Sequence, residues 1–265
     1  MELPEWVPED IDTERFSMAR VYDYLLGGSH NFAVDREYAR RTLELSPDGA
    51  LQAQANRAFL RRAVRYLAEA GIRQFLDIGS GIPTRGNAHE VVQKIAPDAR
   101  VVYVDIDPVA VAHSRQILAG NERAAVIQED LRHPDAILDH PDVRALLHPD
   151  QPTALLLIAI LHAIPDADDP YRIVARLRDG LPPGSHLAIS HGSMDNRPDL
   201  IARLAEIYDR GGYPVTPRSR TEVLRFFDGF ELIEPGLVWA PQWRPDDTQG
   251  NPADSSNLVG VGHKP

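Results

Sequence analysis

The chain has 265 residues, and its 39 acidic against 28 basic side chains give a formal net charge of −11 with histidine neutral. Hydrophobic residues make up 43 % and charged residues 25 %, which excludes a disordered or fibrous chain. No long apolar run, signal-peptide pattern or cysteine occurs, so we expect a cytoplasmic protein without a membrane span, disulfides or a zinc–cysteine site. The acidic balance argues against a nucleic-acid partner, which would need a basic face.

The first seventy residues predict a mostly helical extension. Residues 1–14 are rich in proline and acid and predict an extended segment. Apolar residues at helical spacing predict helices over 16–26, 34–45 and 49–70, with glycines after the first and third. We therefore divide the chain into a helical extension over 1–71 and a second unit over 72–265.

Strands and helices alternate from Gln74 onward. Predicted strands cover 74–78, 101–105, 124–128, 153–160, 186–190, 230–233 and 258–261. Helices are expected over 87–95, from Pro108, over 171–178 and 199–209, and in a short segment capped by Thr221. The pattern predicts an α/β fold with a parallel sheet, helices on both faces and a ligand site at the carboxyl ends of the strands.

A glycine turn follows the first strand. Gly79-Ser80-Gly81 would let a ligand approach the backbone closely, although the same pattern occurs in ordinary strand-to-helix turns. Asp77 stands where a parallel strand should be apolar, and a buried carboxylate is costly without a partner. That partner could be a cationic group of a ligand or backbone N–H groups.

Two more acids stand at the ends of the next two strands. Asp105 stands where an acid accepts hydrogen bonds from the ribose hydroxyls of an adenosine ligand. Its alternative role is a helix N-cap, for which Asp107 is better placed because it directly precedes Pro108. Asp130 follows the third strand, where a carboxylate can accept a hydrogen bond from the adenine amine or simply belong to a polar loop.

The nucleotide could belong to a nicotinamide dinucleotide or to S-adenosylmethionine. The dinucleotide pattern requires a third small residue after the glycines, whereas Ile82, Pro83 and Thr84 follow here. Asp77 would also repel a pyrophosphate. S-adenosylmethionine carries a cationic sulfonium and ammonium and no phosphate, so the charge pattern favours it.

These residues resemble the first three binding motifs of class I S-adenosylmethionine-dependent methyltransferases, over residues 74–265. The resemblance implies a Rossmann-like sheet of seven strands, mostly parallel, with the last strand antiparallel. It implies that Asp77 and Gly79, Ser80 and Gly81 hold the methionine part, Asp105 the ribose, and Ile106, Asp130 and Leu131 the adenine. We also expect Ala159, at the end of the fourth strand, to line the cofactor site. Pro83 departs from the pattern, since many members have a glycine near it.

A closer resemblance covers nearly the whole chain. Residues 19–32 and Asp35-Arg36 resemble the opening signature of one bacterial family of S-adenosylmethionine-dependent methyltransferases, long catalogued as a domain of unknown function. Residues 161–166 and 183–191 are similar to its later blocks. This resemblance implies the fold and the cofactor but no substrate.

Two histidines are candidates for catalysis. Methyl transfer is promoted chiefly by holding the nucleophile in line with the methyl group, and an oxygen or nitrogen nucleophile can also need a general base. His162, after the fourth strand, is the first candidate, and His191, after the fifth, is the second. Each could instead be a structural histidine.

The extension is expected to fold over the strand ends as a lid that excludes water. Its candidate substrate or lid residues are Tyr22, Asp23, Gly28, His30 and Asn31. We expect Tyr22 and its apolar neighbours to pack, and Asp23, His30 and Asn31 to face the site, with Gly28 as part of a hinge or helix cap.

Three tryptophans and a group of four arginines are further candidates for ligand contacts. Trp6, Trp239 and Trp243 could line an aromatic acceptor pocket, with surface packing the favoured reading for the last two. The helix over 52–65 carries four arginines, for which a solvated face is favoured over an anion-binding face: Arg57, Arg61, Arg62 and Arg65.

The sequence thus predicts a metal-independent methyltransferase that uses S-adenosylmethionine on a small-molecule acceptor. The alternatives are a protein that binds S-adenosylmethionine or its product without transfer, and an NAD-dependent oxidoreductase.

Overall fold

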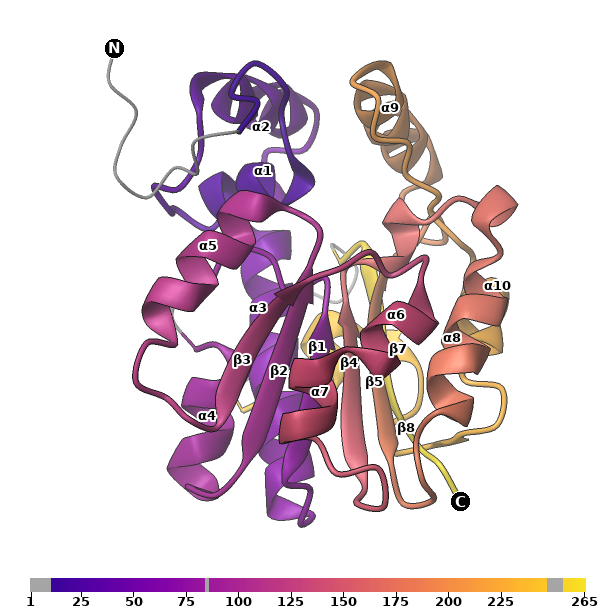
Figure 1. Ribbon diagram of the computed structural model, residues 1–265. Helices are drawn as coiled ribbons and strands as arrows, with labels where there is room; N and C mark the ends of the chain where they lie inside the picture. The colour runs from indigo at the N-terminus through magenta and orange to yellow at the C-terminus, as the bar shows by residue number, and fades with distance from the viewer. Residues whose placement is uncertain (1–10, 84–85, 247–254) are drawn as a thin grey trace.

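The computed structural model describes residues 11–83, 86–246 and 255–265, so Trp6 and the predicted extended segment before residue 11 lie outside it. Three helices come first, α1 (Met18–Leu25), α2 (Ala33–Leu45) and α3 (Gly49–Glu69). This confirms the predicted helices of the extension. The sheet and its helices follow in the same chain, and α1 and α2 stand above the strand ends (Figure 1).

The sheet is mixed and mostly parallel, as predicted. Its order is β3-β2-β1-β4-β5-β8-β6, with β8 antiparallel to both of its neighbours on that path. The strands are β1 (Gln74–Ile78), β2 (Arg100–Asp105), β3 (Ala124–Gln128), β4 (Thr153–Ile158), β5 (His186–Gly192), β6 (Glu231–Leu232), β7 (Val238–Trp239) and β8 (Asn257–His263). Seven strands lie on the path, and the two-residue β7, which was not predicted, pairs with β8 beside it.

Helices cover both faces of the sheet (Figure 1). Successive side chains of β4 point to opposite faces, so Leu156 belongs to the cluster beneath α3 and Leu155 to the cluster on the other face. The remaining helices are α4 (Ala88–Ile95), α5 (Pro108–Ile117), α6 (Pro134–Asp139), α7 (Pro141–Leu146), α8 (Pro170–Asp179), α9 (Pro198–Arg210) and α10 (Arg220–Arg225), with 3-10 turns η1 (Leu161–Ala163), η2 (Asp166–Asp168) and η3 (Ala240–Gln242).

Two local predictions need correction. The short helix α10 is capped by Ser219, not Thr221, because the Ser219 hydroxyl and the Glu222 carboxylate form a reciprocal capping box. The predicted surface packing of Trp243 is also wrong. Its ring is fully buried and meets Phe59 edge-on at 5.4 Å between centroids.

Helix α9 joins the N-terminal helices above the strand ends. The Tyr208 hydroxyl lies 3.3 Å from Thr42 Oγ1, and Arg197 forms a 2.6 Å ion pair with Asp48. Phe16 packs against Tyr213 with ring centroids 4.8 Å apart. We call α1, α2, α9 and the loop 211–217 the roof, because these contacts close it over the sheet edge.

No helix within the described ranges is long and apolar enough to cross a membrane.

Candidate cofactor and acceptor site

A cavity of about 800 Å³ lies between the strand ends and the roof. Its floor is at the carboxyl ends of β1 to β4, where the strand order reverses between β1 and β4, the usual ligand site of open α/β sheets. The cavity brings together all of the predicted cofactor residues: Asp77, Gly79, Ser80, Gly81, Asp105, Ile106, Asp130, Leu131 and Ala159. His162 and Tyr22 line it too.

Asp77 is a buried carboxylate in the floor. It is 4 % exposed and has no hydrogen-bond partner among the described residues. Burial raises the pKa of Asp77 to about 7, which the nearby Arg57 charge opposes and the Asp105 charge reinforces. Such a carboxylate is costly to bury, and a cationic ligand group would stabilise it.

The glycine turn depends on two special backbone conformations. Gly79 and Gly81 have φ angles of +72° and +66°, which favour glycine. A Cβ on Gly79 would also come within 2.5 Å of the Ile160 side chain. The Ser80 hydroxyl between them is buried, with no partner in the described chain.

Asp105 ties the turn to the next strand. Its oxygens accept hydrogen bonds from Gly81 N–H at 2.7 Å and Asp107 N–H at 2.9 Å. Burial raises the pKa of Asp105 to about 6, against the lowering effect of these bonds. Asp107 caps α5 by accepting from Val109 N–H at 2.7 Å, as the sequence predicted. A carboxylate has room for about four hydrogen bonds, so Asp105 can accept further hydrogen bonds from a ligand.

The side of the cavity that is predicted to hold adenine is apolar at Ile106 and acidic at Asp130. Ile106 lines the cavity and is 56 % exposed, so its side chain is available to pack against a ring. Asp130 already accepts from the Arg132 guanidinium at 2.8 and 3.0 Å. Burial alone would raise the pKa of Asp130, but Arg132 outweighs it and lowers the pKa. Ala159 has a strained φ of +56°, and backbone strain of this kind is frequent at functional sites.

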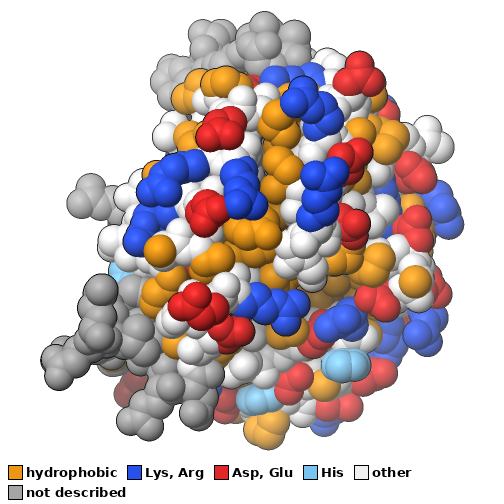
Figure 2. Space-filling view, turned by 90° about the horizontal axis from the view of Figure 1, so that it is seen from above, with side chains coloured by type: hydrophobic (Ala, Val, Ile, Leu, Met, Phe, Trp, Pro, Cys, Tyr) orange, Lys and Arg blue, Asp and Glu red, His pale blue; other side chains and the backbone are white. Residues whose placement is uncertain are grey.

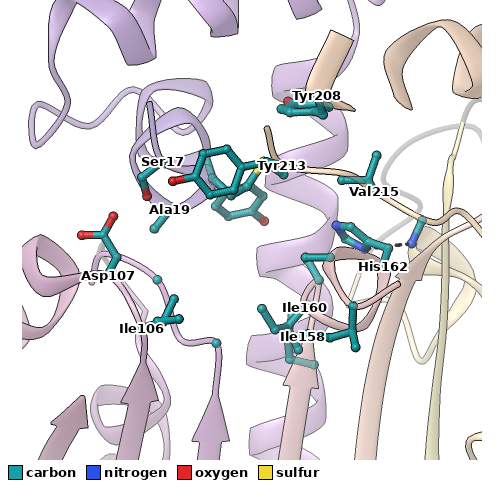
Figure 3. A pocket seen from close by; sticks show the side chains of 18 of the residues that line it. Ser17, Ala19, Ile106, Asp107, Ile158, Ile160, His162, Tyr208, Tyr213 and Val215 are labelled. Atoms are coloured by element: carbon teal, nitrogen blue, oxygen red, sulfur yellow. Dashed lines mark hydrogen bonds between the residues drawn. The ribbon is translucent and has the colours of Figure 1, made fainter. Parts of the chain in front are cut away.

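His162 stands beneath the roof (Figure 3). Burial, with a smaller effect of the Arg218 charge, lowers the pKa of His162 to about 4, so the ring is neutral at pH 7. Its Nδ1 accepts a long hydrogen bond, 3.4 Å, from Gly192 N–H. The ring proton therefore lies on Nε2, which has no partner among the described residues. This tautomer offers a donor where a base was predicted.

His191 is not part of the cavity. It is fully buried, its Nδ1 lies 2.7 Å from the Gly192 carbonyl, and its Nε2 lies 3.1 Å from the Arg218 guanidinium. Arginine can only donate, so His191 Nε2 must accept and Nδ1 donate. With both nitrogens engaged, the structure favours a structural role over the predicted catalytic one.

Arg218 holds the loop that carries His162. The guanidinium is 1 % exposed and donates to the carbonyls of Leu161 and Ile164 at 3.0 and 2.9 Å. It also forms a 2.6 Å ion pair with Asp166. Nothing in the sequence pattern singled out this arginine.

Four residues of the N-terminal signature, Asp23, Gly28, His30 and Asn31, build a turn and do not face the cavity as predicted. Asp23 Oδ2 accepts from His30 N–H at 2.9 Å and from the Asn31 amide at 2.8 Å. A Cβ on Gly28 would lie 1.9 Å from the Asp23 carboxylate, so the glycine is required by the turn. These four residues lie outside the cavity lining.

Tyr22 and Asn56 do reach the cavity. The Tyr22 hydroxyl donates to the Ala53 carbonyl at 3.1 Å and accepts from Asn56 Nδ2 at 2.9 Å. This orientation leaves Asn56 Oδ1 buried without a partner among the described residues, as a free acceptor in the cavity wall. Sequence reasoning missed it.

The arginines of α3 are not a simple solvated face. Arg57 is 8 % exposed, lines the cavity and donates to Asn87 at 3.0 Å. Arg62 donates to the carbonyls of Ala240 and Trp243. Arg57 shares the inward stripe of Ala53 and Leu60, and that spacing could have revealed it.

The fold and the cavity define a class I methyltransferase. The cavity lies where the order of the parallel strands reverses, and the antiparallel β8 is inserted into the sheet. A profile described as S-adenosyl methyltransferase matches residues 4–265, and the chain belongs to this family. S-adenosylmethionine is therefore its cofactor.

Two crystal structures are similar along the whole chain. A DUF574 family protein from Streptomyces avermitilis is 42 % identical, with a TM-score of 0.93 over 96 % of this chain and 99 % of that chain. A Thermobifida fusca protein assigned to the methyltransferases is also 42 % identical, with a TM-score of 0.92 over 98 % of this chain and 99 % of that one.

The fold extends to more distant enzymes. N-methyltransferase NodS from Bradyrhizobium japonicum, in complex with S-adenosyl-L-homocysteine, is 16 % identical, with a TM-score of 0.50 over 93 % of this chain and 99 % of that chain. No curated protein gives a significant match.

The side chains fit this cofactor. Asp77 is a buried carboxyl group that could pair with a cationic group, and Arg57 is a buried cation that could meet a carboxylate. Ser80 Oγ and Asn56 Oδ1 are buried polar atoms that a ligand could satisfy. Within the described residues, no cluster of histidines and carboxylates is arranged to hold a metal ion.

Proposed function

We propose that the protein transfers the methyl group of S-adenosylmethionine to an oxygen or nitrogen atom of a small molecule. The observation that carries the proposal is the division of one cavity into two chemically different halves. Carboxylates gather at the ends of β1 to β3, whereas the wall from α9 and loop 211–217 is uncharged. The volume of about 800 Å³ falls within the range of small-molecule sites.

The roof supports a small acceptor. The ion pair between Arg197 and Asp48 and the contact of Tyr208 with Thr42 join α9 to the N-terminal helices above the cavity. A side chain on the surface of a folded macromolecule would have to pass this bridge. A free small molecule can instead be enclosed, and water excluded from the reacting atoms.

When bound, S-adenosylmethionine would supply an electrophilic methyl group: the acceptor oxygen or nitrogen bonds to the methyl carbon in line, the carbon–sulfur bond breaks, S-adenosylhomocysteine leaves, and the acceptor gives up its O–H or N–H proton. In this proposal, Asp77 and Arg57 hold the two charges of the methionine part, Asp105 accepts from the ribose, and Ile106 lies against the adenine. His162 contacts the acceptor through Nε2. Catalysis then comes chiefly from orientation and the exclusion of water.

A turnover experiment tests this function. The protein is incubated with S-adenosylmethionine and a library of phenols, amines, carboxylic acids and alcohols, and the release of S-adenosylhomocysteine is measured. We expect release that depends on an acceptor and that is lost in Asp105→Ala, which removes the ribose contact. Tight cofactor binding without acceptor-dependent release would instead support a protein that binds the cofactor without transferring its methyl group.

A further inference from the structure

The wall formed by α9 and its following loop has an unusual composition for a cavity in so acidic a protein. Every residue between Ile201 and Pro217 that lines the cavity is uncharged, and the wall includes two tyrosine rings, Tyr208 and Tyr213. Val215 completes this wall next to His162 (Figure 3). On the face seen from above, hydrophobic side chains gather in a central hollow with charged side chains around it (Figure 2).

The charged side chains of the opposite wall are either paired or stand at the exposed rim, as Asp12 does. Arg20 of α1 lines the cavity, but its guanidinium is 3 % exposed and paired with Asp35 at 3.1 Å. Arg15 stands at the exposed rim, with its guanidinium 5.0 Å from the centre of the Tyr213 ring. Away from this rim, an ionic acceptor beside Val215 would therefore lose its hydration without gaining a partner of opposite charge.

Next to this wall, His162 presents a directed hydrogen-bond donor. Because His162 Nδ1 accepts from Gly192 N–H, Nε2 carries the proton and can donate to a ligand atom. The loop that carries His162 is held by Thr216 of loop 211–217, whose N–H donates to the His162 carbonyl at 2.7 Å. Loop 211–217 thus supplies part of the apolar wall and also helps to position the His162 Nε2–H donor.

Building on the proposed function, we propose that the methyl acceptor is an uncharged aromatic compound, bound against Tyr208, Tyr213 and Val215. One of its oxygen or nitrogen atoms accepts a hydrogen bond from His162 Nε2–H. Aromatic rings pack favourably on tyrosine rings. A flat apolar ring can also lie against this wall without burying polar atoms that lack a hydrogen-bond partner. The acidic floor remains for the cofactor.

Titration calorimetry on protein already loaded with S-adenosylhomocysteine tests this class. The probes are 2-naphthol, which is aromatic and neutral, spermidine, which is cationic, and inositol, which is neutral and polar. We expect 2-naphthol to bind about tenfold more tightly than either of the others. Equal or weaker binding of 2-naphthol, including no binding at all, would overturn the proposal.

Two variants locate the site. Val215→Trp fills the wall and should weaken 2-naphthol about tenfold while leaving S-adenosylhomocysteine affinity unchanged. Leu224→Trp, on the exposed side of α10, is the matched control and should change neither. Undiminished 2-naphthol binding in Val215→Trp would contradict the proposal.

These binding measurements distinguish a failure of the proposed function from a failure of the aromatic acceptor class. Failure of the wild-type protein to bind S-adenosylhomocysteine would refute the proposed function, and the acceptor class would fall with it. Normal S-adenosylhomocysteine binding together with preference for spermidine or inositol would refute only the aromatic acceptor.

Discussion

Replacing Asp77 with asparagine should weaken S-adenosylhomocysteine binding about a hundredfold, because the change removes the buried anion expected to pair with the ligand ammonium. The wild-type affinity should also depend on pH. The raised pKa of Asp77, about 7, means that the ligand-free carboxyl takes up a proton below that pH and loses its attraction for a cation. We expect affinity to fall about tenfold per pH unit below 7.

The same substitution should stabilise the ligand-free protein. A carboxyl whose pKa is higher in the folded than in the unfolded state binds more protons when folded, so its contribution to stability decreases as pH rises from about 4 to 7. The cost at pH 8 is at most about 4 kcal/mol. Asp77→Asn removes it, and the melting temperature without ligand should rise by several degrees.

Calorimetry and thermal melting at pH 6, 7 and 8 check both effects. Asp98→Asn, a surface carboxyl that is 72 % exposed, is the matched control. If Asp77→Asn bound S-adenosylhomocysteine as tightly as the wild type and kept its pH dependence, Asp77 would have no part in holding the cofactor.

Arg218→Met should destabilise the fold by about 3–5 kcal/mol, the usual cost of removing one partner from a buried charged network. The carbonyls of Leu161 and Ile164 would lose their donor, and Asp166 its ion pair. Because these residues flank His162, acceptor turnover should fall together with stability.

Urea unfolding measures the first effect, and the release of S-adenosylhomocysteine measures the second. Arg172→Met, at a side chain that is 81 % exposed, should unfold within about 0.5 kcal/mol of the wild type. An unchanged unfolding midpoint in Arg218→Met would show that the buried guanidinium does not support the His162 loop.

The cofactor half of the cavity could be predicted because its signals are local. Asp77 stands in an apolar strand just before the glycine turn, and Asp105 ends the next strand at a sequence distance typical of ribose contacts. Parallel strands then bring these positions to one edge without further information. The positions of most strands and helices along the chain follow from the same periodicity, whereas the antiparallel last strand was implied only by the resemblance, and α6 and α7 were not predicted.

The roof could not be predicted in this way. Its contacts join residues far apart in the chain, such as Thr42 with Tyr208, and loop 211–217 has no periodic pattern to place it. The N-terminal signature misled because polar side chains suggested a site. Asp23 instead satisfies the N–H groups of its own turn, as short polar side chains often do.

Titration calorimetry with S-adenosylhomocysteine and with NAD tests the central assignment most directly, because both ligands carry an adenosine but only NAD carries a pyrophosphate. We expect S-adenosylhomocysteine to bind at one site per chain with micromolar or better affinity, and NAD to give no measurable heat. Tight binding of NAD and none of S-adenosylhomocysteine would contradict the account of this cavity.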